Sequence, residues 1–73
     1  MDFSLWFAQR LKVLRAENGG ISQANLANEC NIGIATYERL ELGRYKPRID
    51  TCVLIARYYN LSLSALFEGY ELE

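Results

Sequence analysis

The feature that most constrains this chain is a pair of short helical patterns separated by only a few residues. Leu26 and Cys30 recur at helical spacing in the first pattern, and Tyr37 and Leu40 do so in the second. Asn31 lies between them, and asparagine is one of the few residues that adopts the left-handed conformation of a tight turn. Two short helices must therefore meet at a sharp angle in the middle of the chain.

The rest of the chain also has only helical periodicity. No segment alternates apolar and polar residues, so no strand is expected. Inward stripes are formed by Phe3, Phe7, Leu11 and Leu14 near the N-terminus, and by Cys52, Ile55, Ala56 and Tyr59 later in the chain. The 73 residues predict a single all-α domain, residues 1–73, of five helices. The helices cover about residues 3–17, 23–30, 34–42, 49–59 and 63–67.

Capping residues support these boundaries. Asp2 or Ser4 can begin the first helix, and Gly19-Gly20 ends it. Ser22 and Ser62 precede the second and fifth helices, where a serine side chain can accept a hydrogen bond from a free backbone N–H group.

The two central helices and their turn predict a helix-turn-helix over about residues 23–42. In this motif the first helix crosses the DNA backbone, and the second presents its N-terminal residues to base edges in the major groove. The motif needs a small inward residue, a left-handed turn residue and then an inward apolar residue. Ala27, Asn31 and Tyr37 supply them in this order.

Four stretches carry a resemblance to a known family. They are "LKVLR" (Leu11–Arg15), "SQANLA" (Ser22–Ala27), "YERLELGRYKP" (Tyr37–Pro47) and "LIARYYNLSLSALF" (Leu54–Phe67). Over about residues 9–67 the chain resembles the Cro/repressor-type, or XRE-like, helix-turn-helix family of bacteria and phages. The resemblance implies five helices, sequence-specific binding to double-stranded DNA, and a two-fold dimer on inverted half-sites. Short members resemble phage or mobile-element repressors, or restriction–modification controller proteins.

The charge distribution fits this resemblance better than the net charge does. The net charge is −1 and the isoelectric point is about 5.4, whereas nucleic-acid-binding domains are usually basic. All 8 basic residues, however, lie between Arg10 and Arg57 with only five acidic residues, so this span carries +3. The acidic residues Glu68, Glu71 and Glu73 lie beyond it. A basic face with an acidic tail elsewhere is compatible with DNA binding.

The third helix opens with Gly33, Ile34 and Ala35, where the family usually has polar residues. Ile34 and Ala35 are predicted to contact thymine methyl groups in the major groove. Arg39, one turn further on, can donate to guanine O6 and N7, or else contact phosphate or a neighbouring glutamate. An exposed surface or a protein contact is the alternative for the two apolar residues.

Phosphate contacts are predicted around this helix, where they fix the register of binding and carry little sequence information. The candidate residues are Gln23, Thr36, Arg44, Tyr45, Lys46 and Arg48. The alternative is an ordinary solvated helix end and loop. Arg15 and Glu41 match a family pair, and the resemblance implies that they form an ion pair between the first and third helices.

An apolar set near the C-terminus predicts a homodimer through about residues 49–71. Apolar residues make up 51% of the chain, which exceeds what a small monomeric core requires. The candidate interface residues are Leu54, Tyr58, Leu61, Phe67 and Tyr70. Alternatively, the C-terminal tail folds over them, and Trp6 packs against that tail.

The chain lacks the residues that several functional classes require. With no histidine and two cysteines, no metal site, cofactor or catalytic set is expected, so an enzyme is not expected. Cys30 and Cys52 lie on inward stripes and are expected to be free thiols in a reducing cytoplasm, with a disulfide as the alternative. No apolar run is long enough for a membrane span. The leading hypothesis is a DNA-binding transcriptional regulator; the alternative is an antitoxin-like protein-interaction module on the same fold.

Overall fold

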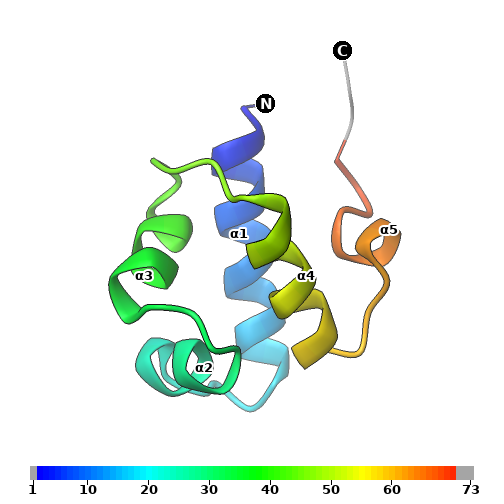
Figure 1. The fold of residues 1–73 in the computed structure, drawn as a ribbon. Helices are drawn as coiled ribbons and strands as arrows, with labels where there is room; N and C mark the ends of the chain where they lie inside the picture. The colour runs from blue at the N-terminus through cyan, green and yellow to red at the C-terminus, as the bar shows by residue number, and fades with distance from the viewer. Residues whose placement is uncertain (1, 71–73) are drawn as a thin grey trace.

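The computed structural model describes residues 2–70, which form five α-helices around one hydrophobic core (Figure 1). The helices are α1 (Phe3–Glu17), α2 (Gln23–Glu29), α3 (Ile34–Leu42), α4 (Ile49–Tyr58) and α5 (Leu63–Leu66). No strand occurs among residues 2–70. The predicted all-α fold of five helices is confirmed. Glu71, the last residue of the predicted dimer region, and the acidic Glu73 lie outside the described residues.

Three predicted helices end slightly earlier than expected. The sequence predicts Cys30, Tyr59 and Phe67 as helical, whereas each is the C-cap that follows its helix. At two of these ends the next residue is an asparagine with positive φ, 61° at Asn31 and 58° at Asn60. A left-handed residue cannot continue a right-handed helix, so the chain turns there.

Side-chain caps begin three of the helices. Asp2, Ser22 and Ser62 each accept a hydrogen bond from the backbone N–H three residues further on, at 3.3, 3.1 and 3.0 Å. Asp2 is therefore the cap of α1, and Ser4, the alternative, is buried. Such caps typically contribute about 1 kcal/mol to stability. Helix α3 begins differently, because Gly33 has no side chain to provide a cap.

Helix α1 runs through the middle of the molecule, with α3 on one side and α4 and α5 on the other (Figure 1). Its inward stripe meets residues from every other helix in a single core. The largest fully buried side chains are Phe7, Leu11, Leu26, Tyr37, Leu40, Ile55 and Leu66. Phe3 and Tyr59, both predicted as core residues, are only partly buried and pack at the edge of this cluster. The core holds α2 and α3 firmly against α1.

The segment after α5 folds back onto the N-terminal half of α1. Tyr70 packs against Phe3 and Trp6, with ring centroids 5.0 and 5.2 Å apart. Phe67 lies 5.8 Å from Phe3 and 6.0 Å from Phe7. Aromatic pairs at these separations are attractive beyond the area they bury. The C-terminal aromatic residues therefore help to close the core of the same molecule.

Candidate nucleic-acid interface

The outward face of α3 presents the residues that were predicted to read bases. Ile34 is 49% exposed at the first position of the helix, and Ala35 is also exposed. Arg39 is exposed one turn further along, beside the exposed Glu38. Thr36, predicted to contact phosphate, is half-buried. The helix therefore offers apolar groups near its N-terminus and an exposed guanidinium beyond them.

The N-terminus of α3 has free backbone N–H groups. Gly33 is the N-cap and makes no side-chain hydrogen bond, whereas Ser22 caps α2. The backbone at Gly33 is extended, with φ −60° and ψ 138°, a conformation open to any residue. Uncapped N–H groups at a helix N-terminus attract anions because they add to the positive end of the helix dipole.

The loop after α3 carries the predicted basic side chains. Arg44, Lys46 and Arg48 are exposed, and Tyr45 is 37% exposed between them. Arg48 forms an exposed ion pair with Asp50 at 3.4 Å, and pairs of this kind contribute little to stability. Among residues 2–70, Arg44 and Lys46 form no ion pair.

Gly43 sets the direction in which this loop leaves α3. Its φ is 78°, and a Cβ built there would lie 2.8 Å from Cδ2 of Leu5 on α1. A side chain at this position would meet both backbone strain and a steric clash. The glycine lets the loop leave α3 close against α1 and cross toward α4, as Figure 1 shows.

An open hollow separates the starts of α3 and α4. Its volume is about 270 Å³, and its lining includes Asn31, Thr36, Tyr45, Arg48 and Leu54. Three of the predicted phosphate contacts therefore line one shallow surface, Thr36 from α3 and both Tyr45 and Arg48 from the loop that follows it. The fold brings them together beside the outward face of α3.

The inward face of α3 holds a buried carboxylate that is saturated with hydrogen bonds. Glu41 is 2% exposed. Its Oε2 accepts from Arg15 Nε at 2.8 Å and from the Tyr37 hydroxyl. Its Oε1 accepts from an Arg15 terminal nitrogen at 3.0 Å and from Gln23 Nε2 at 2.9 Å. Arg15 also donates to the carbonyl of Ile21 at 2.9 Å, so one guanidinium joins α1, α3 and the segment before α2.

The hydrogen bonds to this carboxylate favour its charged form. Burial alone would raise the pKa of Glu41, but the hydrogen bonds from Arg15, Tyr37 and Gln23 outweigh burial and lower it. The hydrogen bond to Glu41 raises the pKa of Arg15. Burial, reinforced by Glu41, raises the pKa of Tyr37, so its hydroxyl remains a donor. Nothing in the sequence pattern singled out Tyr37 as a polar partner, because its spacing marked it only as a core residue.

The side-chain amide of Gln23 donates to the buried Glu41 carboxylate on α3. The predicted contact of Gln23 with phosphate stays a prediction. The side chain is half-buried, and its N–H donates to an anion within the protein. Sequence reasoning missed this contact because Gln23 and Glu41 are 18 residues apart.

The five residues predicted as a dimer patch do not share one exposed surface. Phe67 and Tyr70 pack against α1, and Trp6 packs against Tyr70. Tyr58 accepts a hydrogen bond from Asn18 at 2.7 Å, and Leu61 lines a separate hollow beside Asn18. Leu54 lines the hollow between α3 and α4. The side chains diverge because α4, α5 and the tail wrap around α1. Large exposed apolar side chains occur elsewhere and include Leu42 at 62% and Ile49 at 64%.

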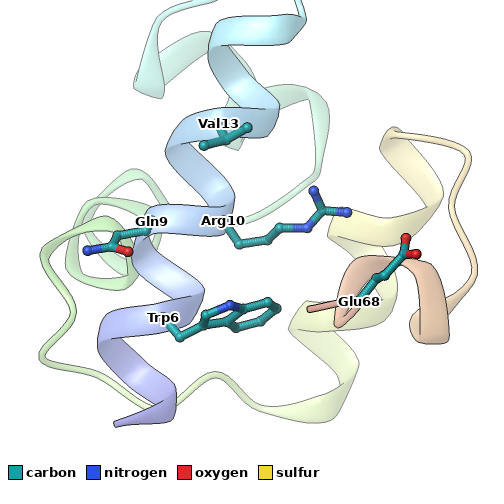
Figure 2. A pocket seen from close by; sticks show the side chains of 5 residues that line it. All are labelled: Trp6, Gln9, Arg10, Val13 and Glu68. Atoms are coloured by element: carbon teal, nitrogen blue, oxygen red, sulfur yellow. The ribbon is translucent and has the colours of Figure 1, made fainter. Parts of the chain in front are cut away.

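A further hollow of about 250 Å³ lies between α1 and the end of α5 (Figure 2). It is lined by Trp6, Gln9, Arg10, Val13 and Glu68. Arg10 donates from Nε to the Leu66 carbonyl at 3.0 Å and from a terminal nitrogen to the Ala65 carbonyl at 2.9 Å. Because those carbonyls lie at the end of α5, Arg10 acts as a C-terminal cap that ties α5 to α1.

Other chemical features are limited in the part of the chain that the structure describes. Cys30 and Cys52 are buried free thiols, as expected, and burial raises the pKa of Cys30 to about 11. Among residues 2–70 no cluster of three metal-binding side chains is found. No described helix has the length and apolar character needed to cross a membrane.

Comparisons with known proteins agree with this arrangement. The profile of the helix-turn-helix family matches residues 11–66, so the chain belongs to this family, of the Cro/repressor or XRE-like type. A curated relative is the cryptic phage CTXphi transcriptional repressor RstR of Vibrio cholerae, which is 28% identical over 65 residues. The alignment covers 89% of this chain and 58% of the relative, so the chain spans little more than half of that protein. No solved structure gives a significant match.

Proposed function

We propose that this protein is a sequence-specific DNA-binding transcriptional regulator, a repressor or autoregulator that acts in the cytoplasm. The observation that carries the proposal is the outward face of α3, with Ile34 and Arg39 exposed beside the basic loop of residues 44–48. Family membership and the similarity to a phage repressor support it.

In the proposed complex α3 enters the major groove. Ile34 and Ala35 contact thymine methyl groups, and Arg39 donates to guanine. Arg44 and Lys46 neutralise phosphates, which strengthens binding to every sequence. The free N–H groups at Gly33 lie near the same backbone and add a neutral contact. Discrimination between sequences then depends on a few contacts and on DNA shape.

A homodimer remains part of the proposal, with a different contact from the one predicted. Ile49 is 64% exposed at the start of α4, directly after the basic loop. Two copies on adjacent half-sites must meet beside the DNA, and Ile49 is an exposed apolar residue next to the proposed phosphate contacts. Ile49→Glu should then abolish self-association in sedimentation, while Leu54→Glu should have a smaller effect. If wild type and Ile49→Glu sediment identically, Ile49 does not contribute to a dimer contact.

The direct test is a gel shift with the DNA upstream of the protein's own gene, performed at several salt concentrations. A specific complex should survive excess unrelated DNA, and footprinting should protect two inverted half-sites about 34 Å apart, or one helical turn. If no DNA is protected at any salt concentration, α3 does not read DNA. The exposed Ile34 and Leu42 would then favour the second candidate, a protein-interaction module.

A further inference from the structure

We infer that Asp50 limits the affinity of this protein for DNA, because its carboxylate competes with DNA phosphate for the guanidinium of Arg48. The inference rests on the proposed function and concerns the same surface. It gives a role to an acidic residue that lies among the predicted phosphate contacts.

Asp50 lines the hollow between the starts of α3 and α4. Three predicted phosphate contacts, Thr36, Tyr45 and Arg48, line the same hollow. The Asp50 side chain is 67% exposed, so it meets the solvent from which a phosphate would approach. Because a carboxylate and a phosphate repel each other, this surface contains one residue that opposes the binding of DNA.

The Asp50 carboxylate occupies donors that a phosphate could use. Its Oδ1 lies 3.4 Å from Nε of Arg48 and accepts a hydrogen bond from the backbone N–H of Thr51 at 2.9 Å. Guanidinium groups and the backbone N–H groups of a helix N-terminus are common phosphate-binding groups in proteins. Asp50 therefore places an anion of the protein itself where the anion of a DNA backbone would gain the same contacts.

The ion pair is weak enough to exchange with DNA. The Arg48 side chain is 76% exposed, and exposed pairs of this kind contribute little to stability. Arg48 can therefore contact a phosphate, but it then gives up part of its interaction with Asp50. Binding gains only the difference between the two contacts. At a given protein concentration, occupancy of DNA then depends more strongly on the base contacts of α3.

The alternative role for Asp50 is purely structural. An acidic residue in the first turn of a helix stabilises it through the helix dipole, and Asp50 lies in the first turn of α4. This role predicts that neutral variants lose stability and gain no affinity for DNA. Competition predicts a gain in affinity, which a loss of folded protein cannot produce.

The experiment compares wild type with Asp50→Asn, which removes the charge and nearly keeps the size of the side chain. Fluorescence anisotropy measures binding to a short duplex of unrelated sequence and to the DNA upstream of the protein's own gene, at several salt concentrations. Circular dichroism checks folding. Glu17→Gln is the matched control, because it changes the net charge equally and Glu17 is an exposed residue that lines a different hollow.

Asp50→Asn should bind both DNAs about twofold to fivefold more tightly per bound protomer, the effect of one exposed ion pair. The salt dependence should steepen by up to about 0.9 per protomer, because one more cation is free to act on phosphate. Glu17→Gln should match wild type. Equal gains in the two variants would show that only net charge matters and would overturn the inference, as would unchanged affinity in Asp50→Asn.

Arg48→Met tests the partner that the inference names, because it removes the charge and keeps a long side chain. Adding Asp50→Asn to this variant should give a smaller gain in affinity than in wild type, since the group for which the carboxylate competes is absent. An undiminished gain would mean that Asp50 repels phosphate directly, against the inference. If Asp50→Asn does not fold, Asp50→Ser decides by the same measurements. Failure of the wild type to bind either DNA at any salt concentration would instead contradict the proposed function.

Discussion

The two faces of α3 are made by neighbouring residues but have opposite properties. On the inward face Tyr37, Leu40 and Glu41 are at most 2% exposed, and the polar groups of Tyr37 and Glu41 are hydrogen-bonded. On the outward face Ile34 is half exposed and Arg39 is exposed. The difference indicates that the inward face stabilises the fold, whereas the outward face is open to solvent. Substitutions on the two faces should therefore separate folding from binding.

The largest expected effect is on the inward face. Arg15→Ala leaves the Glu41 carboxylate buried without its charged partner, so the free energy of unfolding should fall by about 3 kcal/mol. Urea denaturation measures this. The matched control is Arg48→Ala, which breaks an ion pair whose side chains are 76% and 67% exposed and should cost less than about 0.5 kcal/mol. If the two variants were equally stable, the contrast between the faces would be wrong.

On the outward face the expected effect is on binding and not on stability. Arg39→Ala should weaken DNA binding by about 1–3 kcal/mol per half-site, at one base pair only, with an unchanged melting temperature. Lys46→Ala should weaken binding to all sequences and reduce the salt dependence by about 1 per half-site. Binding titrations with single-base operator variants at two salt concentrations distinguish the effect of Arg39→Ala from that of Lys46→Ala. A uniform loss in Arg39→Ala would make that residue a phosphate contact.

Lowering the pH should reduce the part of the protein's stability that comes from the inward face of α3. The pKa of Glu41 is lower in the folded protein than in the unfolded chain, so the unfolded state binds more protons as the pH falls. The stability from ionised Glu41 is complete above its unfolded pKa of about 4.3 and is lost as the pH falls through the folded pKa. The slope of stability against pH in this window should be shallower in Glu41→Gln, by up to about 1.4 kcal/mol per pH unit. Identical slopes would mean that the carboxylate is not held in its charged form.

The smallest expected effect on stability is at Gly33, where α3 begins. Gly33→Ser should raise the free energy of unfolding by about 0.5–1 kcal/mol, because a serine can cap α3 and restricts the unfolded chain. A Cβ at Gly33 meets only Thr36 Oγ1, at 3.7 Å. Gly43→Ser is the contrasting variant and should destabilise the protein, because φ is 78° and Leu5 lies 2.8 Å from the new Cβ. Thermal melts of both variants test this, and a destabilised Gly33→Ser would show that its N-terminus is already optimal.

The fold was largely predictable because local signals agreed with one another. Ser22 and Ser62 cap the helices they precede, and Asn31 has the left-handed conformation that its type suggested. The candidate site was less predictable. Helical spacing identified Tyr37 as a core residue but carries no information about the partner of its hydroxyl. The apolar character of Phe67 could not show whether it faces α1 of the same molecule or a second molecule.

The sequence by itself determined the all-α class, the five helices, the helix-turn-helix and its family, since helical periodicity, caps and motif spacing are local properties of the chain. Only the tertiary structure decided that Gln23 meets Glu41, that three predicted phosphate contacts share one hollow, and that Phe67 and Tyr70 cover α1. These contacts join residues from different helices and loops. They depend on the angles at which the helices pack, and those angles are set by the whole core and not by any one segment.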